Sequence, residues 1–326
     1  MRSEGKRHDW GNLLLWALVG IGIALRLREY VFGRSLWLDE AMLANNVADR
    51  TFLGLLRPLA DDQVCPVGLL FLFKAATVLF GATDYALRLV PLLSGIALLL
   101  TARPLLRDLG GVPGAALGLA LLACNRQLIY FANEVKQYES EAAVVLGVLL
   151  ALHLYGKGRL SFGWLVGIGA AALFFAHTAL FAVAAAGGVL LLDWLDGRAP
   201  EKRRRFLVAG GVWFFAAGAE YALFLRHAEG NGHLQGFWAE GFPPGIAAEL
   251  AANLAWIGHE AWHLFDFAWV WQAGTPHGWT LLSDFGLAFL LVAGVPFLVV
   301  RERRCAVGIA FFGLAILAAA AAHAYP

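Results

Sequence analysis

An all-α, polytopic transmembrane helical bundle is predicted by three properties of this 326-residue chain. Hydrophobic residues make up 60% of it and charged residues only 15%, and the mean hydropathy is +0.66. Apolar runs close to the about 20 residues that cross a hydrocarbon core recur along the chain. Lys and Arg gather in alternate intervals between those runs, which is typical of loops on one face of a membrane. We therefore expect about nine membrane-spanning helices.

Ten apolar runs supply the candidate helices, and one of them is short. The runs are residues 12–31, 66–80, 86–105, 112–131, 139–155, 160–176, 179–192, 206–225, 281–300 and 305–322. The second run begins with Pro66, contains Lys74 and has only 15 residues, which is short for a span. We expect it to lie at the membrane surface as a juxtamembrane helix, which leaves nine spans.

Nine spans place the basic loops on one side of the membrane. The N-terminus and the loops around Arg103, Lys157, Arg203 and Arg303 then share a face that holds 15 of the 25 Lys and Arg. The positive-inside rule assigns that face to the cytoplasm. We therefore expect a first outer loop at residues 32–85 and a second large, Trp-rich outer loop at residues 226–280.

The first outer loop begins with two adjacent acidic residues, Asp39 and Glu40. Adjacent carboxylates beside a bilayer are costly unless they face water or a functional site. Residues 41–56 follow with a partly helical apolar spacing, which predicts a helix in the plane of the interface. Capping of that helix is the structural alternative for the two acids, because acidic residues are favourable in a first helical turn.

The predicted spans hold almost no charged residues between their ends, and Glu220, near the outer end of its helix, is the main exception. Many other charged residues gather at the predicted outer ends of the spans. A transporter or pump normally holds such residues near the bilayer midplane. The distribution therefore favours chemistry at the membrane surface. The formal net charge of +1 argues against a nucleic-acid partner. The three widely spaced cysteines indicate neither a disulfide framework nor a CxxC metal site.

Four short segments are informative when they are taken together in their order along the chain: residues 37–41 (WLDEA), 62–70 (DQVCPVGLL), 80–91 (FGATDYALRLVP) and 130–138 (YFANEVKQY). Together they resemble motifs of the GT-C glycosyltransferases, the group of protein mannosyltransferases and aminoarabinose lipid A transferases. The resemblance covers roughly residues 12–192. Cys65 stands where the family often has His, and Lys136 replaces a common Arg. Lys136 keeps the charge but loses the bidentate fork of a guanidinium group.

The resemblance implies an inverting glycosyltransferase at the outer face of a membrane, which for this family is often the bacterial inner membrane. It implies that a sugar moves from a polyprenyl-phosphate-linked donor to a hydroxyl of an envelope glycan, lipid or protein. It also implies a GT-C-like catalytic module at residues 1–225. The Trp-rich loop at residues 226–280 and C-terminal spans at residues 281–326 follow. Family members often continue with further spans after this point.

Three acidic residues are candidates for proton transfer and positioning in this chemistry. Asp39 is the candidate base that accepts the proton of the acceptor hydroxyl, with Glu40 beside it. Glu134 is a candidate to orient Lys136 or, together with Glu40, to bind a divalent metal. No cofactor beyond that metal is indicated.

Three further residues are candidates for donor binding. Lys136 and Arg88 are expected to stabilise the leaving polyprenyl phosphate, and Tyr138 to position the sugar or phosphate. Anchoring at the membrane interface is the structural alternative for both cations. The whole interpretation requires that the turns carrying Asp39 and Lys136 converge on one aqueous pocket.

A rival motif lies in the second large outer loop, where residues 259–263 read HEAWH. On a helix this pattern places His259 and His263 on one face with Glu260 beside them, as in zinc peptidases. A membrane zinc peptidase is therefore one alternative, and His277 is its candidate third ligand. A non-catalytic transporter or scaffold for lipid-linked sugars is another.

Overall fold

A computed structural model describes residues 2–224 and 303–321, with positions 226, 252, 255, 256 and 258 between them. Every regular element in these residues is a helix, which confirms the predicted all-α class for this part of the chain. Contacts divide the chain into two compact units. The first comprises Met1–Ala179 and Ala216–Leu225, and the second comprises Leu180–Phe215 and Arg226–Pro326.

Five helices among the described residues are long and apolar enough to cross a membrane. They are α1 (Arg2–Phe32), α4 (Asp84–Cys124), α6 (Tyr138–Gly156), α8 (Ala179–Gly197) and α9 (Pro200–Leu223). These helices indicate a membrane protein. The number of nine spans stays a prediction, since the run at residues 281–300 lies outside the described residues.

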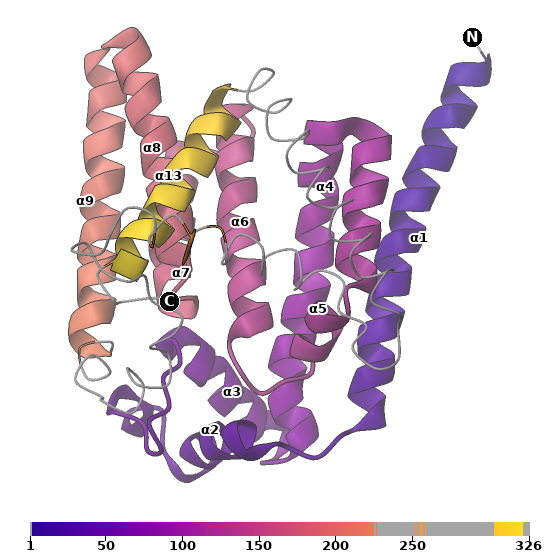
Figure 1. Cartoon of the computed structure of the whole chain (residues 1–326), viewed down its shortest axis with the longest axis vertical. Helices are drawn as coiled ribbons and strands as arrows, with labels where there is room; N and C mark the ends of the chain where they lie inside the picture. The colour runs from indigo at the N-terminus through magenta and orange to yellow at the C-terminus, as the bar shows by residue number, and fades with distance from the viewer. Residues whose placement is uncertain are drawn as a thin grey trace. The chain divides into compact units, whose positions relative to one another are not determined.

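Helix α4 reverses its direction at Gly111, whose backbone has φ 64° and ψ −163°. A Cβ atom on Gly118 would lie 2.8 Å from the Leu106 side chain. In a straight helix the two residues would be about 18 Å apart along the axis. Glycine adopts the positive φ at the reversal without steric cost. The two arms of α4, visible in Figure 1, occupy the positions of two predicted spans, and α5 (Arg126–Phe131) extends the second arm.

Two apolar helices of the first unit are too short to cross a bilayer in a straight line. Helices α3 (Val67–Phe80) and α7 (Phe162–Phe175) have 14 residues each, about 21 Å of rise against a hydrocarbon core of about 30 Å. The run at residues 66–80 therefore forms the short helix that was predicted. Helix α7 is also shorter than the span predicted at residues 160–176.

Helix α2 (Leu38–Asp49) lies where a helix was predicted at residues 41–56, but it begins three residues earlier and ends seven residues earlier. The 3-10 turn η1 (Gly54–Leu56) follows it. Lys74 of α3 donates to the carbonyl oxygens of Val47 and Ala48 at the end of α2, at 3.0 and 3.2 Å. Lys74 thus satisfies the last carbonyl groups of a neighbouring helix, which explains why a charged residue occurs within the apolar run of α3.

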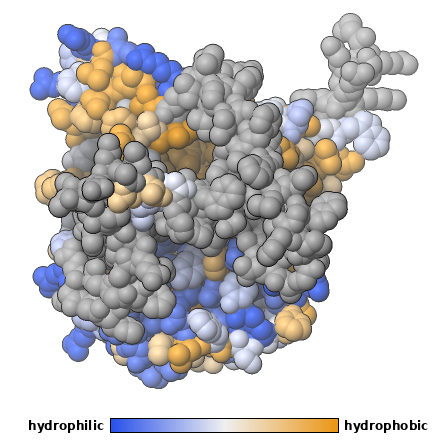
Figure 2. Space-filling model, in the orientation of Figure 1, coloured by the Kyte–Doolittle hydropathy of each residue, from blue (hydrophilic) through white to orange (hydrophobic). Residues whose placement is uncertain are grey.

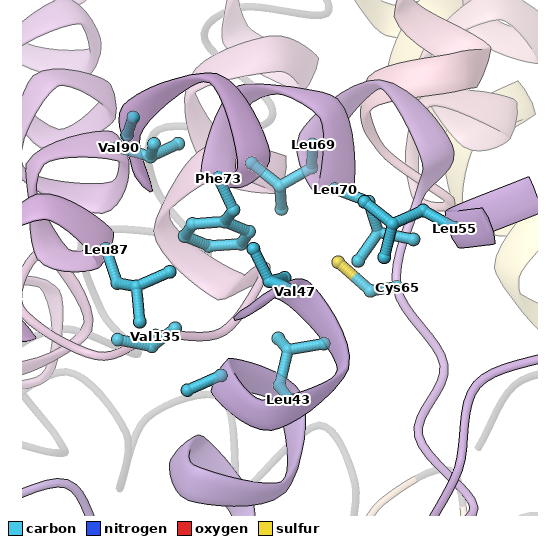
Figure 3. Close-up of a cluster of buried hydrophobic side chains, with 12 residues drawn as sticks. Leu43, Val47, Leu55, Cys65, Leu69, Leu70, Phe73, Leu87, Val90 and Val135 are labelled. Atoms are coloured by element: carbon cyan, nitrogen blue, oxygen red, sulfur yellow. The ribbon is translucent and has the colours of Figure 1, made fainter. Parts of the chain in front are cut away.

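A shared hydrophobic core joins α2, α3 and the start of α4. Figure 3 shows Leu43 and Val47 of α2 facing Phe73 of α3 and Leu87 of α4. Val135, from the loop between α5 and α6, is fully buried in the same core. Burial of its side chain against α2 brings the two loops together, and this contact positions the candidate site.

The opposite end of the first unit carries the basic turns. Arg103 of α4 donates to Asn12 of α1. Asp108, beside the reversal of α4, lies 3.1 Å from His153 and 3.4 Å from Arg159 at the turn between α6 and α7. Figure 1 shows α2 and α3 at the end of this unit away from the N-terminus. The structure therefore separates the basic turns from the acidic loop. Which of these two ends lies on the cytoplasmic side of the membrane stays a prediction.

The second unit contains most of α8, the first part of α9 and α13 (Arg303–Ala321). Phe312 of α13 meets Phe181 of α8 edge to face, with ring centroids 6.0 Å apart. Phe311 fills the space above Gly188, where a side chain on that residue would clash with it. A helix is therefore present at the run predicted for residues 305–322.

Candidate functional site

Asp39 and Lys136 come together from two loops that are far apart in the sequence. The Asp39 Oδ2 atom lies 3.7 Å from the Lys136 Nζ atom. The Asp39 side chain is 48% exposed and the Lys136 side chain 10% exposed. Lys136 also donates to Gln63 Oε1 at 2.7 Å, which fixes the ammonium group from a third segment. An accessible carboxylate and a nearly enclosed cation therefore lie side by side at one end of the first unit.

Glu40, the neighbour of Asp39, has a different environment because it is fully buried. Its Oε2 atom accepts from Arg34 at 2.8 Å and from the backbone N–H of Trp37 at 3.1 Å. Its Oε1 atom accepts from the backbone N–H of Val135 at 2.8 Å and lies 3.7 Å from Arg88. The contact with Trp37 is the capping interaction considered as an alternative from the sequence.

These contacts give Glu40 a structural role, because its carboxylate joins α2 to the loop that carries Lys136. The contact with the Val135 N–H is direct, and Lys136 is the next residue. Arg34 and Arg88 already balance the charge of Glu40, so a metal held by Glu40 and Glu134 would have to displace them. A direct part for Glu40 in catalysis stays a prediction.

The loop that carries Lys136 is also anchored from α1. Asn133 donates to the carbonyl oxygen of Arg26 at 3.3 Å. The Arg26 guanidinium, itself fully buried, pairs with the fully buried Glu139 at 3.3 Å at the start of α6. Buried ions require such pairing because desolvation is costly. Asn133 and Glu139 therefore hold the loop on both sides of Lys136.

Glu134 is a buried carboxylic acid within this charged cluster, with 6% of the residue exposed. Burial, with the negative charge of Glu40 as the next cause, raises the pKa of Glu134 to about 7, against the opposing effect of Arg34 and Lys136. Its Oε2 atom is buried and accepts no hydrogen bond from the residues described here. Glu134 thus changes charge near neutral pH, which neither of its predicted roles anticipates.

The other predicted donor-binding residues occupy two different environments. Arg88 is 2% exposed and donates to the carbonyl oxygen of Arg34 in addition to its contact with Glu40. Tyr138 is 43% exposed, and its ring packs on Phe131 at a centroid distance of 5.0 Å. Both roles in donor binding stay predictions.

Sequence reasoning did not assign a role to Arg34, Gln63 or Tyr130. The Arg34 guanidinium lies over the Tyr130 ring at 4.5 Å while it pairs with Glu40. Gln63 and Tyr130 fall within the motifs quoted above, so their motif membership was the available signal. Arg34 had only its proximity in sequence to Asp39.

A second polar cluster surrounds His177 in the turn between α7 and α8. His177 Nε2 lies 3.3 Å from Glu220 and Nδ1 lies 4.0 Å from Glu141. Glu141 accepts a hydrogen bond from Thr178 at 2.8 Å. The two ring nitrogens face different carboxylates, so the imidazole lies between them. No group of three His, Cys, Asp or Glu suited to a metal ion occurs in the described part of the chain.

The HEAWH motif with its two histidines, the candidate ligand His277 and most of the Trp-rich loop lie outside the described residues. Comparisons with models of protein families, with curated proteins and with solved structures found no match to this chain.

Proposed function

We propose that this protein is a membrane glycosyltransferase that moves a sugar from a polyprenyl-phosphate-linked donor to a hydroxyl acceptor. The observation that carries the proposal is the pairing of Asp39 with Lys136 at 3.7 Å, together with the different exposure of the two side chains. A transfer of this kind requires a carboxylate that the acceptor can reach and a cation positioned to bind the donor phosphate.

In the proposed reaction the acceptor hydroxyl attacks the anomeric carbon of the donor while Asp39 takes its proton. The bond between that carbon and the phosphate oxygen breaks, and the bonding electrons leave with the polyprenyl phosphate. Lys136 stabilises the negative charge that develops there. A single displacement of this kind inverts the anomeric configuration.

The charged side chains around Asp39 and Lys136 are suited to hold these two residues in place. Glu40, Glu134 and Asp39 carry up to three negative charges, and Arg34, Arg88 and Lys136 carry three positive charges. When Glu134 is protonated the cluster has a net positive charge, which favours a phosphodiester. The anchored loop and Gln63 keep Lys136 in place before the donor arrives. Preorganised charge of this kind lowers the reorganisation needed in the transition state.

The test is lipid and glycan profiling of cells that have or lack the protein. Loss of the protein is expected to accumulate one polyprenyl-phosphate-linked sugar and to remove one envelope glycan, lipid or protein modification. Cells complemented with Asp39→Asn are expected to keep both defects. Asp49→Asn is the matched control, because Asp49 is exposed at the other end of α2 and should restore the normal profile.

Two results would contradict the proposal. One is normal glycans in cells that carry Asp39→Asn at wild-type protein levels. The other is an unchanged pool of lipid-linked sugars in cells that lack the protein. Tightly bound zinc in the purified protein, lost in His259→Ala, would support the peptidase alternative instead.

A further inference from the structure

The turn that joins α8 to α9 in the second unit contains a hollow of about 770 Å³. Its apolar wall includes Leu195, Leu207 and Val208, each about half exposed. Its other residues include Arg198, Arg203 and Arg204. Figure 2 shows hydrophilic residues at this end of α8 and α9 above a hydrophobic surface. The hollow therefore combines exposed apolar area with three guanidinium groups.

Two of the three arginines have no acidic partner among the described residues. Arg204 pairs with Glu201 at 3.2 Å, one turn of α9 away. Within residues 2–224 and 303–321, neither Arg198 nor Arg203 lies within salt-bridge distance of a carboxylate. The Arg203 guanidinium instead lies 5.9 Å from the centre of the Trp194 ring. In the described part of the chain, the rim of the hollow therefore holds two arginines whose positive charge no carboxylate balances.

The acidic residues near this turn do not supply the missing charge, because other arginines hold them. Asp196 lies 3.0 Å from Arg303, and Asp193 lies 2.8 Å from Arg304. Arg198 also has a φ of 45°, a backbone region that non-glycine residues rarely adopt. The turn thus presents a cation from a conformation in which glycine or asparagine is usual.

We propose that this hollow binds an anionic phospholipid, with the lipid phosphate on Arg198 and Arg203 and an acyl chain on the apolar wall. Arginine is suited to this role because its planar fork binds phosphate oxygens in pairs. Basic clusters at the ends of membrane helices attract anionic headgroups. A free phosphate ion would use the arginines and leave the apolar wall exposed, so the mixed lining favours the lipid. This site is independent of the proposed sugar transfer.

The experiment measures lipid retained by the full chain in nanodiscs that contain phosphatidylglycerol and phosphatidylcholine, followed by native mass spectrometry after transfer to detergent. The wild type is expected to retain phosphatidylglycerol in preference to phosphatidylcholine. The double variant Arg198→Gln/Arg203→Gln is expected to bind it about 25-fold more weakly, since each basic side chain at an anionic surface contributes roughly a factor of five. The matched control is Lys157→Gln/Arg159→Gln, which removes two charges from another basic turn and should bind like the wild type.

Equal loss of phosphatidylglycerol in the two double variants would overturn the proposal, because it would show only general attraction between charges. Protection against thermal unfolding by inorganic phosphate equal to that by phosphatidylglycerol would also overturn it, since the apolar wall would then contribute nothing. If the Arg198 and Arg203 variant does not fold, the wild type decides the question. Its preference for phosphatidylglycerol must weaken as salt rises, because salt screens exposed charges, and a preference unchanged by salt contradicts the proposed contact.

Discussion

Replacement of Glu40 by alanine should destabilise the fold far more than replacement of its neighbour Asp39. Glu40 is fully buried and accepts from Arg34, from the Trp37 N–H and from the Val135 N–H, and it lies 3.7 Å from Arg88. Its removal leaves a guanidinium that is only 2% exposed without its counter-ion. Loss of one partner from a buried pair costs about 3–5 kcal/mol. The Asp39 pair, with a carboxylate 48% exposed, should contribute no more than about 1 kcal/mol.

These free energies correspond to measurable differences in melting temperature. At about 2–4 °C per kcal/mol, Glu40→Ala should lower the midpoint by about 6–20 °C and Asp39→Ala by no more than about 4 °C. Thermal unfolding of the purified protein in one detergent, followed by tryptophan fluorescence, gives both values. Glu40→Gln retains the acceptor oxygen and should fall between them. Equal shifts for the two alanine variants would refute the division into a structural and an accessible carboxylate.

Three further predictions concern the surroundings of the site. The raised pKa of Glu134, about 7 against a usual 4.5, means that the folded protein holds an extra proton between these values. Glu134 should therefore lower the unfolding free energy by about 1–3 kcal/mol as pH rises from 5 to 8, and Glu134→Gln should remove that contribution in denaturation curves across this range. Replacement of Glu139 by leucine alone should cost about 3–5 kcal/mol, whereas the pair Arg26→Met/Glu139→Leu should regain most of it; equal instability of the single and double variants in thermal unfolding would contradict the buried pair. Gly95→Ala would place a Cβ 2.8 Å from both Arg26 and Glu139 and should cost about 1–3 kcal/mol. Gly20→Ala, with nothing within 4 Å of the new atom, should not lower the melting temperature, because alanine favours a helix more than glycine does.

Features that depend on residues close together in the chain were predictable from the amino-acid sequence. The apolar run lengths predicted an all-helical protein, and they predicted that the run containing Lys74 forms a short helix. The four motifs drew attention to Asp39, Glu40, Glu134 and Lys136. Run length and local motif order are properties of neighbouring residues, so they need no knowledge of distant contacts.

The different roles of Asp39 and Glu40, by contrast, depend on the tertiary structure. Their types and positions in the sequence are nearly equivalent, yet one is half exposed and the other is enclosed by two guanidinium groups and two backbone N–H groups. The shifted pKa of Glu134 and the buried pair of Arg26 with Glu139 were likewise not foreseen. Burial and Coulomb energy depend on distances between atoms of remote segments, and packing of Val135 into the core between α2, α3 and α4 sets those distances here.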